Sequence, residues 1–231
     1  MRILIIGAVV LFALSGAVLA DVVMDQIGSD PADVTGGYAS QQFEPDYSDY
    51  DCVTMDDFEV NAGQLHIVQV EAVFSGWMGF QSFDNITGWR VEIYSSTATA
   101  SSDLVGDVAS VALTPAQASL LTPYGTSSDA LVTLPVSINL PAAGLYWVGV
   151  IGVMDFDTGG QIGVKESFFA GGFPMNSNAY LANPDGGFGS FDWEKDAAYR
   201  ITTERPDGGA VPEPAGLALM AISALAVRRR R

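Results

Sequence analysis

The sequence is poor in the residues on which most metal and catalytic sites depend. Its 231 residues include one histidine, His66, and one cysteine, Cys52. These counts exclude most metal–thiolate sites, most histidine-based catalytic machinery and any internal disulfide. We therefore expect the stability of the fold to come from packing alone.

Basic residues are also scarce, with 10 Lys and Arg against 27 Asp and Glu. Five of the ten lie at the extreme ends, at Arg2 and residues 228–231. Between residues 21 and 210 there are 26 acidic side chains against five basic ones, a formal charge of −21. Phosphate backbones and anionic lipid heads repel such a body, which argues against nucleic acid as a partner.

The first twenty residues have the pattern of a secretory signal peptide. Arg2 supplies a positive start, residues 3–14 are almost entirely apolar, and Val18 and Ala20 are small residues before a cleavage point. The sequence predicts cleavage between Ala20 and Asp21 by signal peptidase after passage through the secretion translocon. The alternative is an N-terminal anchor, but twelve apolar residues are short for a bilayer core of about 30 Å.

The C-terminal 21 residues contain three consecutive features. A proline-containing motif comes first, an apolar segment at 215–227 follows, and a run of arginines ends the chain. The prolines end any preceding structure, the apolar segment forms a short transmembrane helix, and the arginines stay on the cytoplasmic side. The residues of the motif and the run are Val211, Pro212, Glu213 and Pro214, with Arg228, Arg229, Arg230 and Arg231.

These features together resemble the PEP-CTERM sorting signal of exported Gram-negative bacterial proteins. The resemblance implies that an exosortase, a membrane-bound processing enzyme, cleaves the tail near the Pro-Glu-Pro motif. It also implies transient anchoring at the inner membrane before display on the cell surface or release. The alternative is a plain C-terminal anchor with a basic stop.

The body at residues 21–207 has the alternation of apolar and polar residues that is typical of β-strands. It is clearest at 65–74, 89–94 and 131–140, while 145–154 is apolar on both faces. We expect one all-β domain, a single antiparallel β-sandwich of roughly seven to nine strands. At most one short helix is expected, capped by Thr114 and running through 118–121. Residues 208–210 form the linker to the tail.

The body also resembles the body plan of many exported PEP-CTERM proteins. The segments that carry the resemblance are DDFEV at 56–60, AG at 62–63, WRVEIY at 89–94 and LPAAGLYWV at 140–148. The resemblance implies a jelly-roll-like sandwich. None of these segments is a catalytic motif.

The sequence offers no residue that we expect to be catalytic. His66 is the only imidazole available to a serine or cysteine nucleophile, and its place at the start of a strand indicates a structural residue. No Gly-x-Ser-x-Gly or His-Glu-x-x-His motif occurs. Paired carboxylates could support glycoside hydrolysis, but with so many acids the proximity of two of them discriminates nothing.

Residues 155–166 have most of the spacing of an EF-hand calcium loop. Acids occupy positions 1, 3 and 12, and a glycine occupies position 6. The candidate calcium ligands are Asp155, Asp157, the Gln161 carbonyl and Glu166. The alternative is a plain hairpin loop, because position 5 is Gly159 and the flanks have the pattern of strands.

Two tryptophans are candidates for stacking on sugars. Trp77 and Trp193 lie in segments that read as loops, close to Asp, Asn and Gln side chains, whereas Trp89 and Trp147 fall within strand patterns and are expected in the core. The alternative for both candidates is burial as a plug beneath a loop.

We therefore expect an exported, non-catalytic protein of the cell surface or extracellular matrix, sorted through its C-terminal tail. The alternative function is a carbohydrate-binding module that recognises exopolysaccharide. A carboxylate-based glycosidase is a third hypothesis and requires a cleft with two carboxylates about 5–10 Å apart.

Overall fold

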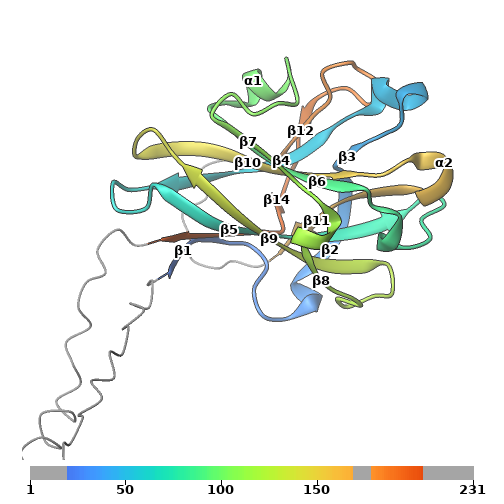
Figure 1. Cartoon of the computed structure of the whole chain (residues 1–231), viewed down its shortest axis with the longest axis horizontal. Helices are drawn as coiled ribbons and strands as arrows, with labels where there is room; N and C mark the ends of the chain where they lie inside the picture. The colour runs from blue at the N-terminus through green and yellow to red at the C-terminus, as the bar shows by residue number, and fades with distance from the viewer. Residues whose placement is uncertain (1–19, 169–177, 205–231) are drawn as a thin grey trace, which may run out of the picture. The chain divides into compact units, whose positions relative to one another are not determined.

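The alternating segments of the sequence form two β-sheets that enclose the core (Figure 1). The computed structural model describes residues 20–168 and 178–204. The predicted signal peptide up to residue 19, the linker and the sorting tail lie outside the described residues. Ala20 and Asp21, the predicted cleavage position, are the first two residues of the first strand.

The first sheet has eight strands arranged around β5. This strand pairs antiparallel with β9 along one side and with β15 and β11 along the other. The members are β1 (Ala20–Asp25), β2 (Val34–Ala39), β5 (His66–Trp77), β8 (Ser119–Leu121), β9 (Asp129–Asn139), β11 (Gln161–Ser167), β14 (Asp196–Ala197) and β15 (Tyr199–Glu204).

The second sheet has seven strands, with β10 at its centre between β4 and β6. Its pairs are antiparallel except for β3, which runs parallel to β10. The members are β3 (Gln41–Gln42), β4 (Val53–Val60), β6 (Gly88–Tyr94), β7 (Ala109–Leu113), β10 (Gly144–Val153), β12 (Tyr180–Ala182) and β13 (Phe191–Asp192).

The core lies between the two sheets and takes apolar side chains from alternate positions of both. Phe74 of β5 meets Trp89 of β6 edge to face, with ring centroids 5.0 Å apart. The Tyr199 hydroxyl donates to the Thr54 carbonyl at 2.6 Å and accepts from the Val150 N–H at 3.1 Å, which ties the sheets together. The antiparallel β-sandwich is therefore confirmed, and the four predicted strands correspond to β5, β6, β9 and β10. The expected number of roughly seven to nine strands is wrong, because the described residues form fifteen.

The expected helix after Thr114 is wrong. The capping box forms, since the Gln117 side chain accepts from the Thr114 N–H at 2.9 Å, but it supports only the 3-10 turn η4 (Pro115–Gln117). Ala118 is extended, and the next residues pair with β9 as β8 because a sheet edge was available to them. Other short helices are η1 (Pro31–Asp33), η2 (Pro45–Tyr50), η3 (Phe83–Asn85), α1 (Thr97–Ala100) and α2 (Phe156–Gly159). None of the helices in the described ranges is long and apolar enough to span a bilayer.

Asp56 of β4 is a buried acid within this framework. Its carboxylate accepts from the Ala197 N–H at 2.6 Å and from the Asp57 N–H at 2.8 Å. Burial raises the pKa of Asp56 well above its usual range, and the charges of Asp196 and Asp57 raise it further, against the effect of the two N–H donors. The folded state therefore holds a proton at pH values where the unfolded chain has lost it.

This proton makes stability depend on pH in a defined direction. Because the folded state binds more protons, the free energy of unfolding falls as pH rises from about 4, the unfolded carboxyl value, through the raised pKa of Asp56. We expect this fall to be smaller in Asp56→Asn and unchanged in the exposed control Asp84→Asn. Chemical denaturation at a series of pH values measures it, and equal slopes in all three proteins would contradict it.

Candidate functional site

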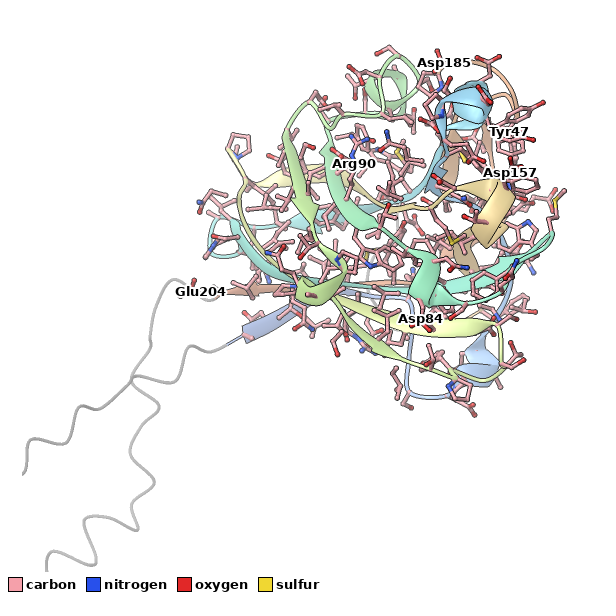
Figure 2. The ribbon with its side chains drawn as sticks, turned by 45° about the vertical axis from the view of Figure 1, so that its right-hand side comes forward. Tyr47, Asp84, Arg90, Asp157, Asp185 and Glu204 are labelled. Atoms are coloured by element: carbon pink, nitrogen blue, oxygen red, sulfur yellow. The ribbon has the colours of Figure 1, made fainter. Side chains whose placement is uncertain are left out.

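Two adjoining hollows form an aromatic groove at one end of the sandwich. They share Gln161 and Phe188 and have volumes of about 260 and 240 Å³. Figure 2 shows Tyr47 and Asp157 at this end and Glu204 at the opposite end. The other large side chains of the groove are Phe43, Tyr47, Tyr50, Met78 and Phe156 in the first hollow and Tyr38, Trp77, Leu181 and Phe191 in the second.

Several of these apolar side chains are exposed. Tyr50, Phe188 and Phe191 are each about 40% exposed, and Met78 is 66% exposed. The Tyr50 and Phe188 rings meet edge to face with centroids 5.1 Å apart. Exposed apolar surface that gathers at one place, with polar groups around it, marks an interaction site more often than scattered exposed side chains do.

Glu44 fixes one wall of the groove by joining η2 to α2. Its carboxylate accepts from the N–H of Phe156 at 2.6 Å and from the N–H of Asp157 at 3.1 Å, which satisfies the first donors of α2. Partial burial raises the pKa of Glu44, but these N–H donors outweigh it and the net pKa is lowered. The contact brings the Tyr47 and Phe156 rings to 5.5 Å between centroids.

Asn183 fixes the opposite wall. Its Nδ2 donates to the carbonyls of Asp49 at 3.0 Å and Asp51 at 2.8 Å, and its Oδ1 accepts from the N–H groups of Phe188 at 2.6 Å and Gly189 at 3.1 Å. One side chain thus joins the loop that carries Phe188 to the segment that carries Tyr50. The exposed rings are held in place before any ligand arrives.

Trp77 lies in the groove as a half-buried side chain at the end of β5. Its Nε1–H donates to Gln161 Oε1 at 2.6 Å, so the indole is oriented by a buried amide. Trp193 does not line the groove. It is 3% exposed and packs against Tyr38 with ring centroids 3.7 Å apart, so no face of its ring is open to a sugar. The prediction of Trp193 as a stacking residue is therefore wrong. Its side chain is buried, as the alternative interpretation expected.

Acidic residues lie on the same segments as the aromatic rings. Asp46 belongs to η2, Asp157 to α2, and Asp185 comes just before Phe188 (Figure 2). Asp157 accepts from the Tyr47 hydroxyl at 3.4 Å, and its charge raises the pKa of that phenol. No carboxylate is among the described residues that line the two hollows. The acids surround the groove but do not form its floor.

The four predicted calcium ligands are not brought together. Asp155 and Asp157 belong to the α2 turn, whereas Gln161 and Glu166 lie five residues apart on β11, about 16 Å at about 3.3 Å per residue. Calcium ligands must all lie within about 2.6 Å of the ion. In the described ranges, no group of three His, Cys, Asp or Glu side chains could hold a metal. The hairpin alternative is also wrong, because this segment connects β10 of one sheet to β11 of the other.

Sequence reasoning found Trp77 but missed the tyrosines and Phe156. The available signal was the pair of loops PDYSDY and NPDGGFG, where aromatic residues stand among Asp, Pro and Gly that favour exposed turns. Comparison of the chain with protein-family models, with curated proteins and with solved structures found no match. The function must therefore be argued from the geometry.

Proposed function

We propose that the protein is exported to the cell surface or extracellular matrix, where its sandwich binds a polysaccharide in the aromatic groove. The observation that carries this proposal is the exposure of Tyr50, Phe188 and Phe191 over two adjoining hollows, held by Asn183 and Glu44. Ring faces contact the apolar C–H faces of sugar rings, while Gln161 and the nearby carboxylates provide oxygen atoms for sugar hydroxyls.

The groove supports binding rather than cleavage. Glycoside hydrolysis requires two carboxylates on opposite sides of the scissile bond. The described residues that line the groove include aromatic rings, Leu181, Met78 and the Gln161 amide, without a carboxylate among them. The carbohydrate-binding function is accordingly favoured over a glycosidase in this groove.

Export and sorting remain part of the proposal and are supported by the two ends of the sequence. In this proposal, signal peptidase cleaves after Ala20, and an exosortase-type enzyme removes the tail at the Val211–Pro214 motif. The chain continues toward that motif from Glu204, which lies at the opposite end of the sandwich from Tyr47 (Figure 2).

The sorting proposal has a direct test in the producing cell. We expect Glu213→Ala to leave the protein unprocessed in the membrane fraction, whereas Glu194→Ala in the body is released like the wild type. Fractionation and the intact mass of the released protein measure this. Release of a correctly trimmed Glu213→Ala protein would contradict the role of the motif.

Charge predicts which polysaccharides the groove accepts. The acids around it and the body's charge of −21 repel uronate or sulfate groups, so neutral or amino sugars should bind and anionic ones should not. Affinity electrophoresis against gels that contain neutral, amino-sugar or uronate polymers tests this. Retardation by the uronate gel alone would overturn the assignment, and retardation by none would overturn polysaccharide binding itself.

A further inference from the structure

Three polar side chains from three neighbouring strands form a chain of contacts at the end of the sandwich away from the aromatic groove. They are Ser137 of β9, His66 of β5 and Glu204 of β15. His66 Nδ1 lies 2.6 Å from Glu204 Oε2, and His66 Nε2 lies 3.0 Å from Ser137 Oγ. The neighbouring residues Ile67 and Ile138 are buried in the core, so His66 and Ser137 point out of the opposite face of the sheet.

The order of these contacts fixes the roles of the atoms. A carboxylate can only accept a hydrogen bond, so the proton of the neutral imidazole lies on Nδ1. Nε2 then presents its lone pair to the Ser137 hydroxyl, which donates to it. A serine, a histidine base and a carboxylate that orients the histidine are the three parts of a nucleophilic acyl-transfer site.

The strands hold this arrangement without relying on a mobile loop. His66 is the register partner of Asn139 on β9 and of Glu204 on β15. The side chains of Asn139, His66 and Glu204 are therefore neighbours across three hydrogen-bonded strands. Asn139 is two residues beyond Ser137 on the same strand and therefore shares its face. The side-chain amide of Asn139 is therefore a hydrogen-bond donor on the same face of the sheet as Ser137 and His66.

A hollow lies beside the histidine. It has a volume of about 380 Å³ and is lined by Ala62, Leu65, His66, Asn139 and Glu204. Ser137 is outside this lining and is connected to the hollow through its contact with His66. The two apolar side chains suit a short acyl group, and the Asn139 amide can donate to an ester oxygen. The side chains of His66 and Glu204 are about a third exposed, and solvent at the site weakens the stabilisation of a developing negative charge. Esters are therefore better suited to the site than amides.

We propose that Ser137 and His66 are catalytic residues of an esterase site for short, uncharged carboxylic esters, with Glu204 as the positioning residue. Ser137 Oγ bonds to the ester carbonyl carbon while its proton passes to His66 Nε2. The bond from that carbon to the alcohol oxygen breaks, and the alcohol leaves with the proton. Water then attacks the acyl carbon and gives a proton to His66 Nε2; the bond from that carbon to Ser137 Oγ breaks, the proton passes from His66 to Ser137 Oγ, and the carboxylic acid leaves.

This proposal goes beyond polysaccharide binding and does not depend on it. It replaces the expectation that the body contains no catalytic residue. The aromatic groove and the serine site lie at opposite ends of the sandwich, so variants of one leave the other intact. Phe188→Ala should therefore not alter the chemistry at Ser137.

A fluorophosphonate probe, which forms a covalent adduct with activated serines, tests the site in the full chain. We expect one adduct, located at Ser137 by peptide mass spectrometry, and slow release of p-nitrophenol from p-nitrophenyl acetate. Ser137→Ala should abolish the adduct, and His66→Gln should slow labelling by about 10²-fold or more, the usual contribution of a general base. Ser119→Ala, an exposed serine on β8 of the same sheet, is the matched control and should label as the wild type does.

The role of Glu204 needs a measurement that a purely structural role would not affect. Glu204→Gln should slow labelling at an unchanged unfolding midpoint, and Glu204→Asp should restore part of the rate. Absence of an adduct in the folded wild type, or an adduct that persists in Ser137→Ala, would overturn the proposal.

Discussion

Replacing either Tyr50 or Phe188 by alanine should weaken polysaccharide binding by roughly thirtyfold. Removing a central aromatic anchor from a binding surface costs about 2 kcal/mol, and 1.4 kcal/mol corresponds to about tenfold in affinity. Because both rings are about 40% exposed, their loss should lower the free energy of unfolding by less than the loss of a fully buried ring does, which is about 3–5 kcal/mol. Affinity electrophoresis together with chemical denaturation separates the two effects.

The matched control for these variants is Leu121→Ala. Leu121 is 59% exposed on β8 and does not line the groove, so its truncation removes comparable apolar surface from elsewhere on the molecule. Binding should be unchanged in this variant. An equal loss of affinity in Leu121→Ala and Phe188→Ala would mean that the groove has no special role.

Lys165→Met should lower the free energy of unfolding by about 3–5 kcal/mol, the usual cost of leaving one member of a buried ion pair alone. Lys165 Nζ lies 2.6 Å from Asp129 Oδ2, and both side chains are almost completely buried. Asp129 Oδ1 is buried and has no hydrogen-bond partner among the residues that the structure describes, so the carboxylate depends on this lysine. Chemical denaturation measures the loss.

The double variant Lys165→Met/Asp129→Leu is the control for this prediction. Replacing a whole buried ion pair by apolar side chains is often neutral or stabilising, so most of the lost stability should return. A single variant that loses less than about 1 kcal/mol would contradict the account, because that is the range of an exposed ion pair.

The strands were predictable where one face of the strand contacts solvent and the other face packs in the core. In β9, Val132, Leu134 and Ile138 are buried and alternate with more exposed positions, and this pattern by itself places the strand against a core. The helix after Thr114 was not predictable in the same way. Its capping box is a local signal that forms as expected, but pairing with β9 decides the conformation of the residues that follow it.

The aromatic groove could not be predicted because its parts are far apart in the sequence. Tyr50, Trp77, Phe156 and Phe188 come from four separate segments. Asn183, Glu44 and Gln161 hold these segments through contacts that no local pattern encodes. The calcium prediction failed for the opposite reason. The spacing of the acids matched that of a calcium loop. Such spacing brings the ligands together only when the chain wraps around the ion, and here the chain from Gln161 onward is the extended strand β11.

The neighbours of His66 were equally hidden. The sequence identifies it as the only imidazole and places it at the start of the strand predicted over 65–74, and in the structure His66 begins β5. Its partners Ser137 and Glu204 are set by the registers of β9 and β15 against β5. A shift of one residue in either register would turn the partner side chain to the other face of the sheet.

The most direct test of the binding account is an NMR titration that follows the four tryptophan indole N–H signals during addition of a neutral oligosaccharide. Trp77 lies in the groove with its indole N–H hydrogen-bonded to Gln161, whereas Trp89 and Trp147 are buried elsewhere. Trp193 is buried against Tyr38, which lines the groove, so its signal does not serve as a control. We expect the Trp77 signal to move in a saturable way and the signals of Trp89 and Trp147 to stay in place. A Trp77 signal that does not move across neutral and amino-sugar ligands would contradict the central claim.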